Sequence, residues 1–148
     1  MKIVQTLLLG LILLPFIVQS DDYPDDASTR VFLSIGSTIT GTTESLGEED
    51  WFKTILVAGR QYTFINGVIT SDPRLSIRGP SPSQTQVGYN DDCCGSHSAS
   101  QIIYTPSTTG IYFLVSMCYS IYTGNYKLGI ADSSYSPECT CKNLHNNN

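Results

Sequence analysis

Carboxylates are the residues of this chain best suited to chemistry, and their densest group lies near the start. Four aspartates fall within the segment 21–26, and Glu48, Glu49 and Asp50 follow further along. Ca²⁺ takes roughly six to eight oxygen ligands, and carboxylates close together in a sequence can supply several of them. The alternative is that these are solvated turn carboxylates in a segment with nothing to bury. The pattern therefore indicates calcium binding without establishing it.

Cysteines form the second group with reactive side chains. There are five: Cys93, Cys94, Cys118, Cys139 and Cys141. In an oxidising compartment most should be paired, and because five is odd, at least one must be free, capped or bonded to another chain. We expect a Cys94–Cys118 bridge, because the loop that contains Cys94 and the end of the strand before Cys118 could meet at one end of a sandwich. Cys93 would then pair with Cys139 or Cys141, although sequence alone does not settle connectivity.

A zinc site is the alternative use of these cysteines. Cys93-Cys94-x-x-His97 and Cys139-x-Cys141-x-x-x-His145 contain ligand types that zinc prefers. Adjacent cysteines give poor chelate spacing, however, and an oxidising compartment favours disulfides. We therefore favour disulfides over zinc.

The residues needed for catalysis are sparse. His97 and His145 are the only histidines, one in a polar loop and one in the tail, and no Gly-x-Ser-x-Gly motif is present. Glu48 and Glu49 are adjacent, so on a strand they face opposite ways and could not act as a paired acid and base. The sequence predicts that the protein is not an enzyme.

Residues 1–20 have the pattern of a cleavable signal peptide. Lys2 is followed by an apolar run from Leu7 to Val18, and small Ser20 precedes the charged Asp21. A membrane anchor is the alternative, but the apolar stretch falls short of the ~20 residues that a bilayer requires. No second apolar run of that length follows. We therefore expect a secreted, extracellular protein with no membrane span in the mature chain.

Charge narrows the range of partners. The full chain has 8 basic and 13 acidic residues, and removing Lys2 with the signal peptide makes the mature part more acidic still. No cluster of Lys and Arg marks a nucleic-acid interface, so we expect no nucleic-acid partner. Calcium, or a basic surface of another protein, fits this charge better.

Short β-strand patterns separated by turn residues occupy the rest of the chain. Apolar and polar residues alternate, or apolar residues run together, over 37–42, 51–57, 61–65, 74–78, 85–89, 101–105, 110–116 and 125–130. The short gap at Gly59 and Arg60 predicts that 51–57 and 61–65 form a hairpin. About eight short strands without helical periodicity predict an all-β sandwich or barrel.

Motifs in these segments, taken in order, resemble a known family. They are Asp22–Asp26, Gly36–Thr42, Glu49–Phe52, Ala58–Phe64, Asp72–Leu75, Asn90–Asp92, Gly110–Val115 and Gly124–Leu128. Together they are similar to the bacterial pre-peptidase C-terminal domain, a family that includes the collagen-binding domains of clostridial collagenases. The resemblance covers roughly residues 21 to 130. It implies a jelly-roll-like antiparallel β-sandwich of about eight strands that is not catalytic.

The resemblance also implies a calcium site. Some collagen-binding relatives hold calcium between the acidic N-terminal segment and the acidic residue that precedes the aromatic pair of the next strand. The matching positions here are Asp22, Asp25, Asp26 and Asp50. A further acidic position of the relatives is Gly47 in this chain, where Glu48 or Glu49 could substitute.

Tyrosines are the last candidates for binding. Tyr119 and Tyr122 bracket a turn-like stretch after the longest strand, where relatives carry ligand-binding aromatic residues. Exposed tyrosines make rigid contact surfaces for protein or sugar, whereas packing in the core is the alternative. For Tyr112 and Tyr126 we expect core packing.

These inferences give one organisation and three functional hypotheses. Residues 1–20 are a signal peptide, 21–130 a β-sandwich, and 131–148 a polar, cysteine-containing tail. The first hypothesis is a secreted, non-catalytic binding or adhesion module for an extracellular protein or glycan, stabilised by calcium. The second is a structural subunit of an extracellular matrix or filament, with covalent self-association through an unpaired cysteine. The third is an accessory domain that acts in trans with a secreted peptidase.

Overall fold

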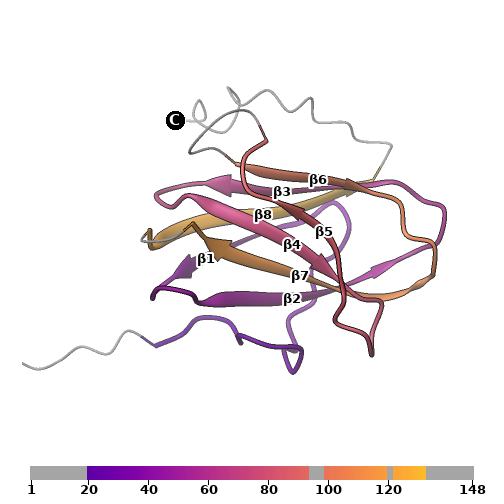
Figure 1. Cartoon of the computed structure of the whole chain (residues 1–148), viewed down its shortest axis with the longest axis horizontal. Helices are drawn as coiled ribbons and strands as arrows, with labels where there is room; N and C mark the ends of the chain where they lie inside the picture. Colours follow the sequence, from indigo (N-terminus) through magenta and orange to yellow (C-terminus); the bar gives the residue numbers. More distant parts are fainter. Residues whose placement is uncertain (1–19, 94–98, 120–121, 133–148) are drawn as a thin grey trace, which may run out of the picture.

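All regular secondary structure in the described part of the chain is β-strand. The computed structural model describes residues 20–93, 99–119 and 122–132. Eight strands follow in order (Figure 1): β1 (Thr38–Thr43), β2 (Glu49–Leu56), β3 (Tyr62–Val68), β4 (Pro73–Arg78), β5 (Gln86–Asn90), β6 (Ser100–Tyr104), β7 (Gly110–Cys118) and β8 (Gly124–Asp132). Each of the eight ranges expected from the sequence overlaps one of these strands. In the same residues, no helix has the length and apolar character to cross a bilayer.

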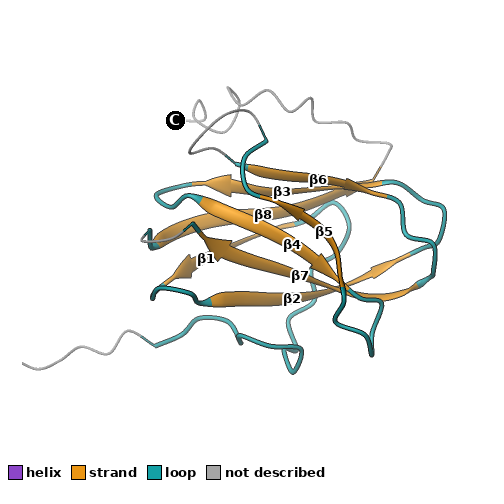
Figure 2. Cartoon of the chain, viewed as in Figure 1, coloured by secondary structure: helices purple, strands orange, loops and turns teal. Residues whose placement is uncertain are grey.

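Two four-stranded antiparallel sheets pack face to face. Their strand orders are β1-β8-β3-β6 and β2-β7-β4-β5, so each connection switches sheet except the one from β4 to β5. This order is that of a jelly roll. Figure 2 shows the strands of both sheets and the loops that join them. The expected all-β sandwich of eight strands is therefore confirmed.

Alternating inward-facing side chains fill the space between the sheets. Phe52 and Leu56 of β2 and Phe64 of β3 are fully buried, and Tyr62 is 1% exposed. Each large apolar side chain removed from water contributes roughly 1.5–3 kcal/mol. Tyr112 and Tyr126 belong to the same cluster, as expected. The two sheets are thus held together chiefly by this shared core.

A second, smaller apolar cluster lies on the outer face of the β2-β7-β4-β5 sheet. Trp51 and Phe113 pack edge to face with ring centroids 5.5 Å apart, beside Val115 and Met117. The guanidinium of Arg78 lies 5.1 Å from the centre of the Trp51 ring. Successive side chains of a strand point to opposite faces of the sheet. Phe52 belongs to the main core, so its neighbour Trp51 faces away from that core.

The predicted hairpin between 51–57 and 61–65 is wrong. β2 pairs with β7, and β3 pairs with β6 and β8, so the connection between β2 and β3 crosses from one sheet to the other. The hydroxyl of Tyr62 accepts a hydrogen bond from the Val57 amide at 3.0 Å and fixes this crossing. Two apolar strands separated by a short turn fit a hairpin and a crossing equally well, because in both cases their apolar faces meet the same core.

The N-terminal segment covers the open side of the sandwich, where edge strands β1 and β2 belong to different sheets. The Trp51 amide donates to the Pro24 carbonyl at 3.1 Å, and the Lys53 amide donates to the Val31 carbonyl at 2.8 Å. The Tyr23 ring packs against Phe52, and its hydroxyl donates to the Thr40 carbonyl. The segment expected to have nothing to bury is therefore fixed to both sheets (Figure 1).

Candidate metal centre

Local turns shape the N-terminal segment. The carboxylate of Asp21 accepts a hydrogen bond from the Tyr23 amide at 3.0 Å, and that of Asp26 accepts one from the Ser28 amide at 2.7 Å. Aspartate side chains commonly bond the backbone two residues ahead and so stabilise a turn. These turns, with the contacts to β1 and β2, direct the aspartates back toward the start of β2.

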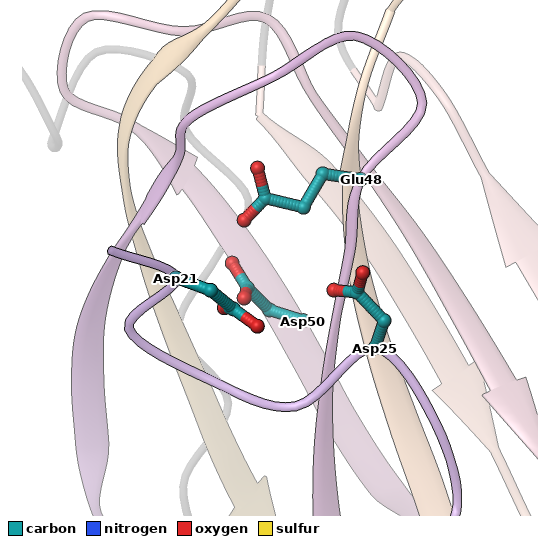
Figure 3. A group of neighbouring side chains, drawn as sticks. All are labelled: Asp21, Asp25, Glu48 and Asp50. Atoms are coloured by element: carbon teal, nitrogen blue, oxygen red, sulfur yellow. The ribbon is translucent and has the colours of Figure 1, made fainter. Parts of the chain in front are cut away.

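Six carboxylates gather there in two overlapping groups. The first group is Asp21, Asp25, Glu48 and Asp50, and the second is Asp21, Asp22, Glu44 and Glu48. Within each group, one carboxylate oxygen from each residue lies within 4.8 Å of one such oxygen from every other member. Figure 3 shows the first group: Asp21 and Asp25 project from the N-terminal loop toward Glu48 and Asp50 at the start of β2. Since the groups share two residues, the arrangement could hold two neighbouring cations.

Asp50 is the most deeply buried member. It is 1% exposed, and its Oδ2 accepts a hydrogen bond from the Tyr126 hydroxyl at 2.7 Å. Its Oδ1 is also buried and has no hydrogen-bond partner in the described part of the chain. Burial raises the pKa of Asp50 to about 8, although the Tyr126 hydrogen bond lowers it. A buried carboxylate with one unpaired oxygen is costly unless a cation is supplied.

Glu48 joins the two groups. Its Oε2 accepts hydrogen bonds from the Glu44 and Ser45 amides at 2.7 and 2.8 Å, which closes the turn between β1 and β2. Its Oε1 is buried without a partner among the residues that the structure describes. Burial, together with neighbouring Glu48 and Asp22, raises the pKa of Glu44 to about 7. Glu44 and Glu48 are thus held near one another, at the expense of the ionised form of Glu44.

Asp22 and Asp25 also have raised pKa values. The pKa of Asp22 is raised by burial and then by the charges of Glu48 and Asp21, against a lowering hydrogen bond from the Thr42 amide. The pKa of Asp25 is raised by burial and by the charges of Asp21 and Glu48. The two ion pairs found in the described ranges, Arg60–Asp132 and Arg78–Glu49, involve neither group.

The residues present therefore fit a hard divalent cation. Carboxylate oxygens are the ligands that Ca²⁺ prefers, and Ca²⁺ tolerates irregular geometry. The unpaired buried oxygens of Asp50 and Glu48 both belong to the first group. A cation there would partner these oxygens and offset both the burial and the like charge that raise the pKa values of these carboxyls.

Most of the residues named from the sequence meet at this centre. Asp22, Asp25 and Asp50 belong to one group or the other, whereas Asp26 belongs to neither. The carboxyl of Asp26 is instead hydrogen-bonded to Ser28, which lowers its pKa. Of the two glutamates considered as substitutes, Glu48 belongs to both groups. Glu49 accepts a hydrogen bond from the Trp51 indole nitrogen at 3.0 Å and lies outside both.

Sequence reasoning missed Asp21 and Glu44. The family resemblance points to Asp22 and not to Asp21, although the two are adjacent. Glu44 lies four residues before Glu48 across a turn in which Gly47 has a φ of +82°. That spacing of two glutamates around a tight turn was the available signal.

The tyrosine and cysteine candidates lie at the same end of the sandwich as the carboxylates, because Met117 near the end of β7 pairs with Glu49 at the start of β2. Tyr119 and Tyr122 are 46% and 42% exposed, in keeping with a surface role, though no ligand contact tests it. Cys118, at the end of β7, is buried as a free thiol. β5 and β7 flank β4 and end at the same side of it, so the segment after Asp92 does begin near Cys118.

The expected cysteine partners cannot be placed. Cys94, Cys139 and Cys141 lie outside the described residues, as do His97 and His145 of the zinc alternative. The Cys94–Cys118 bridge and the pairing of Cys93 with Cys139 or Cys141 therefore stay predictions, as do the signal peptide at 1–20 and the tail at 131–148.

Comparison with known proteins gives a fold and not a sequence family. No protein-family model matches the chain, and no curated protein matches it. The pre-peptidase C-terminal domain of a collagenase from Bacillus anthracis is similar in structure, with a TM-score of 0.58 and 15% identity over 74% of this chain and 99% of that one. PliG from Aeromonas hydrophila, a periplasmic inhibitor of g-type lysozyme, has a TM-score of 0.42 and 15% identity, over 68% and 97% of the two chains. The sandwich described above thus has the fold of a pre-peptidase C-terminal domain, as the order of motifs in the sequence indicates.

Proposed function

We propose that the chain is a non-catalytic extracellular binding module whose N-terminal segment is fixed to the sandwich by calcium. The observation that carries the metal part is the buried, unpaired Oδ1 of Asp50 within a group of four carboxylates. The pKa shifts have the sign expected when anionic ligands are crowded without their counterion. The signal-peptide pattern of residues 1–20 and the fold support an extracellular setting.

The non-catalytic part rests on the chemistry of the described residues. The groups of possible metal ligands found among those residues consist of carboxylates, without histidine or cysteine. Such a cluster suits a hard cation, because carboxylate oxygens are the ligands that Ca²⁺ prefers. The fold adds a precedent, since one solved structure that shares it is the pre-peptidase C-terminal domain of a collagenase. Fold alone does not give function, so a direct binding test is needed.

Adjacent glutamates offer a matched test. Calcium should be titrated by calorimetry into EDTA-treated protein at pH 7.5, and the melting temperature compared with and without calcium. We expect binding with a stoichiometry near two, and a higher melting temperature in calcium. Glu48→Gln should lose most of this binding, whereas Glu49→Gln should retain it, because Glu49 lies outside both groups.

Three results would contradict the proposal. They are no heat of binding, no shift of melting temperature on adding EDTA, or equal effects of Glu48→Gln and Glu49→Gln. The last of these would mean that any calcium bound lies elsewhere on this acidic chain.

A further inference from the structure

A polar groove adjoins the second carboxylate group. It has a volume of about 360 Å³ and is lined by residues of β1, of the start of β8 and of the segment after β3: Asp22, Thr40, Gly41, Thr42, Ile69 and Asn125. Small-molecule sites begin at roughly 300 Å³, so the groove has room for one sugar ring or a group of that size. Asp22 lines the groove and also belongs to the second group, so the groove and the metal centre share a wall.

Hydrogen bonds hold the polar walls in fixed positions. The Thr42 amide donates to Asp22 Oδ2 at 3.0 Å, and the Thr42 hydroxyl donates to Asn125 Oδ1 at 2.9 Å. The backbone carbonyl of Asn125 accepts hydrogen bonds from the Ile69 and Thr70 amides. The backbone amide of Asn125 donates one to the Thr70 hydroxyl at 2.8 Å. Groups fixed before a ligand arrives lose little conformational entropy on binding.

The lining also defines the ligand chemistry. A carboxylate, a side-chain amide and two hydroxyls offer both donors and acceptors, and Ile69, which is 47% exposed, offers one apolar surface. None of the six lining residues is positively charged, and carboxylates crowd one end, so an anionic ligand would be repelled. A neutral ligand rich in hydroxyl groups fits these walls best.

A peptide added as a strand fits less well. β1 is an edge strand, but the N-terminal segment already covers part of that edge. The Thr42 amide is bonded to Asp22, and the Thr40 carbonyl accepts the Tyr23 hydroxyl at 3.0 Å. The backbone groups that an added strand would need are therefore engaged.

We propose that this groove binds a neutral sugar unit of an extracellular glycan, through Asp22, Asn125 and the threonine hydroxyls, with the ring against Ile69. The proposal rests on the proposed function in one respect: a cation in the second carboxylate group holds Asp22 in place. It goes beyond that function by naming the ligand class and the site.

Binding to neutral saccharides tests the groove. The chain, exported and purified from an expression host, should be screened in calcium against neutral hexoses, N-acetylhexosamines and their short oligomers, with a lysine-containing peptide as a competing ligand class. We expect saccharide binding, weakened about fivefold to tenfold by Asn125→Ala as for one lost hydrogen bond. Ile69→Ala should also weaken it, whereas Ile103→Ala should not, because Ile103 is similarly exposed on β6 and does not line the groove.

Calcium titration of the same variants separates this proposal from the previous one. Asn125 and Ile69 belong to neither carboxylate group, so both variants should bind calcium as the unchanged protein does. If calcium binds but no neutral saccharide does, or if the peptide binds instead, the groove proposal is overturned and the metal centre stands. Saccharide binding unaffected by Asn125→Ala and Ile69→Ala also overturns it. If saccharide binds at the groove and the titration shows no calcium binding, the groove is supported and the metal centre is wrong.

Discussion

Replacement of Asp50 by asparagine should have opposite effects on the metal-free and calcium-loaded protein. In the metal-free fold the pKa of Asp50 is about 8, against 3.8 for an ordinary aspartate. Between these values the folded state keeps a proton that the unfolded state has released, so the free energy of unfolding falls as pH rises. Asparagine keeps an acceptor for the Tyr126 hydroxyl and does not titrate. It should therefore stabilise the metal-free protein at neutral pH.

The magnitude follows from this linkage. One group contributes up to about 1.4 kcal/mol per pH unit, or roughly 3 kcal/mol between pH 5 and pH 7.5. Asp21 and Asp25 beside it are exposed, and water entering there reduces the effect to about 2 kcal/mol. Asp50→Asn should then raise the melting temperature by about 5–10 °C at pH 7.5. Near pH 4 the difference should vanish, because Asp50 is protonated in the fold.

Urea unfolding in EDTA at pH 5 and pH 7.5, repeated in saturating calcium, measures both effects. In calcium the unchanged protein should gain stability, and Asp50→Asn should gain little, because a neutral amide is a poorer ligand than a carboxylate. Glu49→Gln is the control at both pH values. If Asp50→Asn destabilises the metal-free protein equally at both, then Asp50 is an ionised partner of Tyr126, and the reasoning fails.

Three further outcomes are expected. Asp26→Asn should leave calcium affinity unchanged in calorimetry, because Asp26 belongs to neither carboxylate group; a loss of affinity would restore the set inferred from the family resemblance. Calcium affinity should rise about tenfold per pH unit between pH 6 and pH 8, since binding displaces the Asp50 proton, and a flat profile would contradict the raised pKa. Gly41→Ala should destabilise the protein by about 3 kcal/mol in urea unfolding, because a Cβ there would meet the buried Tyr126 hydroxyl at 2.2 Å; an unchanged midpoint would show that Tyr126 can move aside.

Strands were predictable from the sequence, whereas their partners were not. Alternation along β3, with Tyr62 and Phe64 buried and Thr63 and Ile65 partly exposed, is a local property that single residues reveal. The connection from β2 to β3 could either form a hairpin within one sheet or cross to the other sheet. Both connections bury the same faces of the two strands, so the sequence pattern does not distinguish them. The wrong hairpin at Gly59 reflects this, because turn residues of that kind serve both connections.

The metal centre was predictable in kind but not in membership. A run of aspartates within residues 21–26 and Asp50 before an aromatic pair indicate carboxylates that meet. Which of two adjacent aspartates faces the centre depends on turns such as the one that Asp26 makes with Ser28. Glu44 belongs to the metal centre because the Glu48 carboxylate accepts hydrogen bonds from the Glu44 and Ser45 amides, which closes the turn between β1 and β2.

The placement of the carboxylates suggests what calcium would control. Asp21, Asp22 and Asp25 belong to the N-terminal segment, whereas Glu44, Glu48 and Asp50 belong to the turn and strand that it covers. Without a counterion, ionisation on both sides would repel the segment, while its backbone bonds to β2 and the packing of Tyr23 on Phe52 would hold it. Because Asp22 also lines the groove and bonds the Thr42 amide, detachment of the segment would remove one groove wall.

We therefore expect amide hydrogen exchange at Thr42 to be faster in EDTA than in calcium at pH 7.5. In Asp50→Asn this difference should shrink, and equal exchange in both conditions would uncouple the groove from the metal centre.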